Sequence, residues 1–131
     1  MSTTHPPVQL APGQIFVRES IGNVLILSPA IDLGSLHEPE IIHETEDLLD
    51  IINHPDGEPI HMVVDLSHSE YFGTALLGAI VKLWKRVSQR GGRLAICNVS
   101  QNVLQVLHVT RLNAIWPIHN SRDEAIKAVR G

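Results

Sequence analysis

The segment Asp65–Gly78, with the sequence DLSHSEYFGTALLG, holds the residues whose order most suggests chemistry. An apolar run ends there, and after Gly73 a hydroxyl residue, Thr74, opens a long helical pattern. A helix N-terminus offers N–H groups and the positive end of the helix dipole, so it favours a negative group. Two interpretations of Thr74 follow. It is the helix N-cap, or it accepts a phosphate that adds about 1.5–2 negative charges to this surface.

Other catalytic and metal-binding patterns are missing from the sequence. The eight histidines include no His-x-x-x-His pair and no cluster with cysteine, so we expect no metal site. We also expect no cofactor, because no phosphate-binding loop, Gly-x-Gly-x-x-Gly or Gly-x-Ser-x-Gly motif occurs. Cys97 ends an apolar run, where cysteine is usually buried and inert, with a reactive thiol as the alternative. A small enzyme using Asp65, His68 or Thr74 is a further alternative, although no third catalytic partner is visible.

Composition narrows the class of protein. The 131 residues are 44% hydrophobic, which is enough for one packed domain, expected over residues 14–131 after a flexible lead-in at 1–13. Fourteen acidic against ten basic residues argue against direct binding to nucleic acid or to an anionic membrane. No apolar run approaches the ~18 residues of a membrane span. The single cysteine permits no intrachain disulfide, so a cytoplasmic location is expected.

The elements that must position Asp65–Gly78 alternate between strands and helices. A hairpin is expected over Ile15–Ser20 and Val24–Ser28, then a helix opened by Pro39, with apolar residues at helical spacing that include Ile41 and Ile42. The later elements are a buried strand at Ile60–Leu66, a helix at Thr74–Arg90 stopped by Gly91-Gly92, a strand at Leu94–Cys97, a helix capped by Ser100, an edge strand at Ile115–Ile118 and a helix opened by the capping box Ser121–Glu124.

The resulting order is β-β-α-β-α-β-α-β-α. Strands separated by helices need crossover connections, so the sequence predicts an α/β domain with a mostly parallel mixed sheet, an N-terminal hairpin and about four helices.

This ordered set of elements resembles the STAS domain of bacterial anti-sigma factor antagonists, from about Phe16 to Val129. The most specific stretches are Val63–Gly78 and Gly91–Ser100. The resemblance implies a protein-binding module without enzymatic activity. Its partner would be an anti-sigma factor, often a serine/threonine kinase with a histidine-kinase-like ATP fold, whose capture releases a sigma factor. The kinase would switch the module off by phosphorylation, and a phosphatase would restore it.

The resemblance also implies which residues act. The family acceptor lies at the start of the helix after the third strand, in a pattern that is usually Asp-Ser-Ser-Gly-Leu-Gly. Thr74 aligns with the acceptor, whereas Phe72, Gly73, Ala75 and Leu77 depart from the pattern. The expected partner-binding residues surround this loop and include one from the loop after the second strand: Asp32, His68, Tyr71, Phe72, Gly73, Thr74 and Leu77.

Those departures keep a second function open. A STAS module without a phospho-switch would serve as a scaffold in a sensory complex or as a subunit associated with a lipid transporter. The sequence does not indicate the oligomeric state.

Overall fold

The computed structural model describes residues 16–29, 38–53, 58–69 and 73–131. The predicted order of elements is confirmed: β1 (Phe16–Ile21), β2 (Val24–Pro29), α1 (Glu38–Ile52), β3 (His61–Asp65), α2 (Thr74–Gln89), β4 (Leu94–Cys97), α3 (Gln101–Val109), a short 3-10 turn (Leu112–Ala114), β5 (Ile118–His119) and α4 (Arg122–Arg130). The expected lead-in at 1–13 lies outside the described residues and stays a prediction. None of the described helices is long and apolar enough to cross a membrane.

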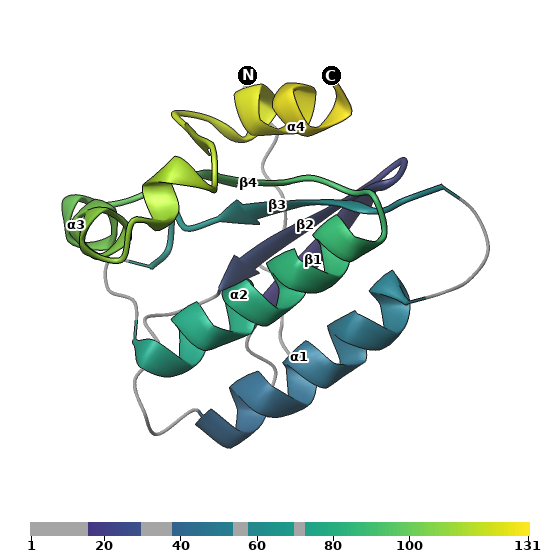
Figure 1. The fold of residues 1–131 in the computed structure, drawn as a ribbon, viewed down its shortest axis with the longest axis horizontal. Coiled ribbons are helices and arrows are strands. Elements are labelled where there is room, and N and C mark those ends of the chain that lie inside the picture. The colour runs from purple at the N-terminus through teal and green to yellow at the C-terminus, as the bar shows by residue number, and fades with distance from the viewer. Residues whose placement is uncertain (1–15, 30–37, 54–57, 70–72) are drawn as a thin grey trace, which may run out of the picture.

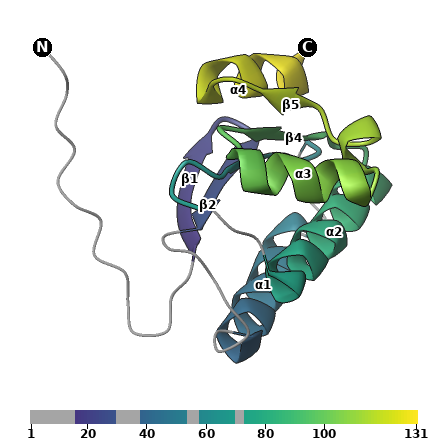
Figure 2. The ribbon, with the colours of Figure 1, turned by 90° about the vertical axis from the view of Figure 1, so that its left-hand side faces the viewer.

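The five strands form one sheet in the order β1-β2-β3-β4-β5. The hairpin strands β1 and β2 pair antiparallel, and every later neighbour pairs parallel. As Figures 1 and 2 show, α1 and α2 lie side by side under one face of the sheet, whereas α4 lies on the other face. The carboxyl ends of β3 and β4 therefore meet at one edge, where their loops lead into α2 and α3.

Side chains from the central strands alternate between two apolar layers. The larger layer includes Leu27, Val64 and Ile96 and packs against buried residues of α1, α2 and α3. The opposite layer contains Ile26, Val63 and Ala95 and is covered by Ala125, Ile126 and Val129 of α4. Because both faces are covered, β2 is buried at all six positions.

Helix boundaries follow the local signals in the sequence. The Ser100 side chain accepts a hydrogen bond from the Val103 amide, and Ser121 accepts one from the Glu124 amide, as the predicted caps require. Helix α2 ends where Gly91 adopts a φ of +83° and the Gly92 amide reaches back to the Val87 carbonyl at 2.8 Å.

The predicted edge strand at Ile115–Ile118 is wrong in extent, because β5 begins only at Ile118. The preceding residues form a 3-10 turn whose Leu112 carbonyl accepts the amides of Ile115 and Trp116. This turn places the Trp116 side chain in the core, fully buried and edge-on to Trp84 with ring centroids 6.2 Å apart. Burial of a large aromatic ring thus outweighs the extended conformation that the local sequence favours.

Two glycines at α2 differ in the space around them, which yields a paired prediction. A Cβ on Gly78 meets nothing within 4 Å, so Gly78→Ala is expected to stabilise the fold by about 0.5–1 kcal/mol through helix propensity. A Cβ on Gly92 would lie 2.1 Å from the Ile60 carbonyl oxygen, so Gly92→Ala is expected to cost about 2–3 kcal/mol. Thermal and urea unfolding measure both. A Gly78→Ala protein less stable than the parent would contradict the open space assigned to that position.

Candidate functional site

Helix α2 begins without a side-chain cap. Gly73 occupies the N-cap position with extended backbone (φ −80°, ψ 167°), and the Leu77 amide donates to its carbonyl at 3.0 Å. Thr74 is therefore the first helical residue, and the interpretation of Thr74 as the N-cap is wrong. The first turn carries no acidic residue that would balance the positive end of the helix dipole.

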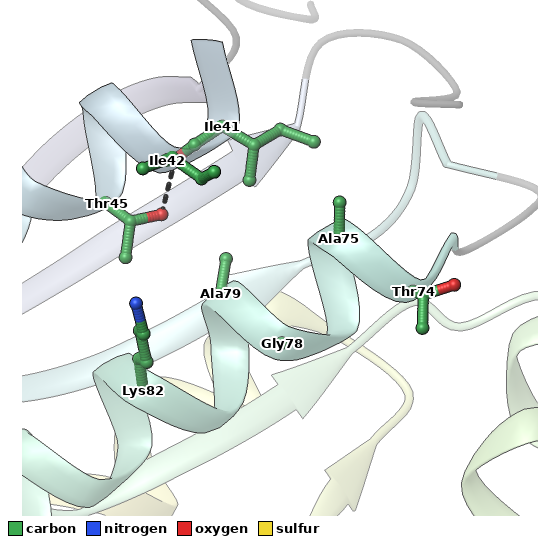
Figure 3. Close-up of a pocket in the computed structure, with 8 residues that line it drawn as sticks. All are labelled: Ile41, Ile42, Thr45, Thr74, Ala75, Gly78, Ala79 and Lys82. Atoms are coloured by element: carbon green, nitrogen blue, oxygen red, sulfur yellow. Dashed lines mark hydrogen bonds between the residues drawn. The ribbon is translucent and has the colours of Figure 1, made fainter. Parts of the chain in front are cut away.

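The Thr74 side chain is exposed. Its hydroxyl makes no hydrogen bond with any residue in the described ranges, and in Figure 3 it projects from the end of α2, away from Ile41, Ile42 and Thr45 of α1. A hydroxyl in this position is accessible to an enzyme. A phosphate attached to it would lie beside the helix amides that precede the first intrahelical hydrogen bond.

The turn that directly follows β3 is held by the Asp65 carboxylate, which is buried at the end of β3. Its Oδ1 accepts hydrogen bonds from the Ser67 amide at 3.0 Å and from the Asn98 side chain at 3.1 Å. Its Oδ2 accepts from Nε and Nη2 of Arg122 at 3.1 and 2.9 Å. The carboxylate therefore fixes the first turn after β3 and joins it to β4 and α4.

Arg122 extends this network to the N-terminal hairpin. Its guanidinium donates to the Glu19 carboxylate on β1 and to the Ser28 hydroxyl on β2, the latter at 3.3 Å. Burial by itself favours a neutral Asp65, but the hydrogen bonds from Asn98, the Ser67 amide and Arg122 outweigh it and hold the pKa of Asp65 below its ordinary value. Asp65 is thus a charged structural anchor, with both oxygens already engaged.

Cys97 lies at the end of β4 and is fully buried. Burial, reinforced by the charge of Asp65, raises the pKa of the Cys97 thiol to about 12. The expected burial of Cys97 is confirmed, and a buried thiol with a raised pKa is protonated near neutral pH, which favours the inert interpretation.

His68 is exposed beside an open depression of about 370 Å³ at the carboxyl ends of β3 and β4. The depression is lined by polar and apolar residues of the two neighbouring loops: Leu66, Ser67, His68, Ser69, Asn98, Val99 and Ser100. Among the residues that the structure describes, no hydrogen bond connects Asp65, His68 and Thr74. The described contacts therefore add no catalytic partner to any of these three residues.

The expected binding residues are only partly placed. His68, Gly73, Thr74 and Leu77 lie on the loop after β3 and the first turn of α2, with Leu77 half-buried against the larger apolar layer. Asp32, Tyr71 and Phe72 lie outside the described residues, so their part in the site stays a prediction.

Sequence reasoning missed a groove of about 270 Å³ between α1 and α2. Thr74 lies at one end of it, and its lining comes from both helices (Figure 3): Ile41, Ile42, Thr45, Thr74, Ala75, Gly78, Ala79 and Lys82. Both isoleucines belong to the apolar residues that recur at helical spacing on α1. Ile41 is buried, but Ile42 is 46% exposed. Adjacent residues on a helix point about 100° apart, so the sequence already indicated that Ile41 and Ile42 face different directions.

Comparison with known proteins identifies one family. Residues 17–125 match the STAS domain model. An anti-sigma F factor antagonist from Paenibacillus polymyxa is 30% identical over 66 residues, which are 50% of this chain and 56% of that protein. The chain thus spans little more than half the length of the curated relatives it matches.

Solved structures agree with this match. The crystal structure of a putative anti-sigma factor antagonist from Thermotoga maritima has a TM-score of 0.76 at 26% identity, over 91% of this chain and 97% of that one. The anti-sigma factor antagonist SpoIIAA, in its unphosphorylated form, has a TM-score of 0.73 over 88% of this chain and 96% of that one. Its identity is 15%, so that likeness concerns the fold alone.

The lowered pKa of Asp65 predicts how stability varies with pH. The charged carboxylate stabilises the fold above the unfolded-state pKa of about 3.9, and this contribution is lost as the pH falls through the lower folded-state value. Asp65→Asn is therefore expected to reduce the free energy of unfolding by about 2 kcal/mol at pH 7, and the difference from the parent should narrow as the pH falls below the unfolded-state value of about 3.9.

Urea unfolding over this pH range measures the effect. The control is Asp123→Asn, the same change at an exposed neighbour of Arg122, which is expected to alter stability only slightly. A difference between Asp65→Asn and the parent that stays constant with pH would contradict the assigned role of the charge.

Proposed function

We propose that this chain, which belongs to the STAS domain family, is an anti-sigma factor antagonist that captures an anti-sigma factor and so releases a sigma factor. The observation that carries the proposal is the position of Thr74, which is the first residue of α2 and is exposed. Gly73 occupies the N-cap position, so the Thr74 hydroxyl does not serve as the cap of this helix. The names of the similar proteins support it, since they are anti-sigma factor antagonists.

The binding surface consists of the loop after β3 and the first turn of α2, with Asp32, His68, Tyr71, Phe72, Gly73, Thr74 and Leu77 as its residues. The hydrogen bonds that Asp65 accepts from the Ser67 amide and from Arg122 fix the turn at which this loop starts. The partner is an anti-sigma factor that is also a serine/threonine kinase of histidine-kinase-like ATP fold, and both act in the cytoplasm. The chain itself supplies a binding surface and performs no catalysis.

Phosphorylation of Thr74 by that kinase is the switch. The phosphate brings about 1.5–2 negative charges to the centre of the surface, at a helix N-terminus that tolerates them without a change of fold. At an interface the same group must be desolvated and repels acidic groups, so the complex dissociates. A phosphatase then returns the antagonist to its binding form. That SpoIIAA was solved in a form described as unphosphorylated is consistent with such a cycle.

A second candidate is a STAS scaffold or transporter-associated subunit without a phospho-switch. It is favoured by the acceptor loop, where Phe72, Gly73, Ala75 and Leu77 replace the usual family residues. In that case Thr74 carries no phosphate in cells, and the protein co-purifies with a membrane or sensory complex instead of a kinase.

The switch predicts opposite behaviour for two substitutions at Thr74. Thr74→Glu is expected to weaken binding to the partner kinase at least about tenfold, because a fixed negative charge takes the place of the phosphate. Thr74→Ala is expected to bind like the parent but to accept no phosphate from the kinase and ATP. Isothermal titration calorimetry and intact-mass analysis with peptide mapping measure the two effects.

Thr110→Ala is the matched control, because Thr110 is also exposed but lies at the carboxyl end of α3, where its hydroxyl donates to the Val106 carbonyl at 2.8 Å. It is expected to bind and to be phosphorylated like the parent. Equal binding by Thr74→Ala and Thr74→Glu, together with an unmodified Thr74, would remove the switch from the proposal.

A further inference from the structure

We propose that the groove between α1 and α2 is a self-association surface, in which Ile42 of one protomer enters the space over Gly78 of a second copy. This inference does not depend on the proposed function. It rests on the shape of the groove, on the exposed side chain beside it and on the charges of the two helices.

The groove has a floor of small residues, and one of them, Gly78, is not explained by packing within the chain. Ala75, Gly78 and Ala79 form its α2 side, and a Cβ on Gly78 would meet nothing within 4 Å. A glycine inside a helix costs about 1 kcal/mol relative to alanine. Because packing within the protomer does not require that glycine, the space above it is suited to a side chain from another molecule.

The rim of the groove supplies such a side chain. Ile42 lines the groove from α1 and is 46% exposed. Next to it, the Thr45 hydroxyl donates to the Ile41 carbonyl at 2.6 Å, so no polar group of Thr45 interrupts the apolar lining (Figure 3). The exposed apolar side chain of Ile42 and the open space over Gly78 therefore lie side by side on one face.

The charges of the two helices select a second copy as the occupant. The exposed side of α1 carries Glu46 and Asp50, and the exposed side of α2 carries Lys82 and Lys85. None of these four residues forms an ion pair with any part of the chain that the structure describes. One surface thus presents an acidic helix beside a basic one, which is the arrangement that a self-complementary interface needs.

Symmetry determines which residues meet. The two helices run in the same direction (Figure 1). The groove brings Ile42 beside Gly78, and near the other end of the helices Arg86 donates a hydrogen bond of 2.6 Å to Asn53. A twofold axis along the groove therefore places α1 of each protomer over α2 of the other. Ile42 then lies over Gly78 and, one helical turn further along both helices, Glu46 lies over Lys82.

The size of the surface indicates a weak dimer. The two helices have 15 and 16 residues and are each about 23 Å long, so their joint face buries roughly 900 Å² in total, below the standard size of a tight interface. A dissociation constant of about 10–100 µM is expected. It should rise with salt, because the ion pairs are at the surface.

Charge reversal tests the proposed pairing directly. Analytical ultracentrifugation of the full chain from about 5 to about 500 µM should show a reversible monomer–dimer equilibrium. Glu46→Lys and Lys82→Glu should each weaken it about tenfold, since each homodimer then holds two like-charge pairs. A mixture of the two variants should restore association near the parental level, because the heterodimer holds only opposite-charge pairs.

Two further variants complete the test: one controls for the position of the charge change, and the other blocks the groove while folding is checked. Asp47→Lys makes the same charge change on the neighbouring residue, outside the groove, and should dimerise like the parent. Gly78→Leu fills the space in the groove and should abolish the dimer while circular dichroism and thermal unfolding remain those of a folded protein.

A parent chain that stays monomeric at the highest concentration overturns the proposal, as does a mixture of the two charge variants that fails to associate. If the parent is monomeric and Gly78→Leu instead weakens binding to the partner kinase, the groove belongs to that partner and the self-association surface is wrong.

Discussion

The buried Asp65 carboxylate is the interaction on which the geometry of this domain depends. It accepts hydrogen bonds from the Ser67 amide, from Asn98 after β4 and from Arg122 at the start of α4, 57 residues further along the chain. Arg122 in turn reaches Glu19 and Ser28 of the hairpin. A charge in the interior is stable only with such partners, so the turn that directly follows β3, at Ser67, is held in place by this carboxylate.

That constraint extends to the start of α2. The helix begins shortly after the anchored turn, and its buried residues hold it on the sheet, with Leu76 and Ile80 fully enclosed. The exposed side of the helix is consequently presented in one orientation, with Thr74 at its amino end and Gly78 one turn later. One rigid helix therefore presents two different surfaces, one at its N-terminus and one along the groove that it shares with α1.

Local patterns predicted most of the architecture because they report energies that act within a few residues. The alternation of strands and helices, the caps at Ser100 and Ser121 and the stop at Gly91-Gly92 all follow from backbone hydrogen bonding over short distances. The same patterns failed where long-range packing decides. The turn that buries Trp116 against Trp84 shortened the predicted edge strand, and Ile42 is 46% exposed although it belongs to the apolar residues at helical spacing on α1.

By itself, the sequence determined the order of elements, the α/β class and the position of Thr74 at the start of the strongest helix. Tertiary structure alone decided that Arg122 pairs with Asp65 and that α1 and α2 leave a groove between Ile42 and Gly78. The physical reason is that burial and ion pairing depend on residues far apart in the chain, whose meeting is set by the packing of helices on the sheet and not by any local preference.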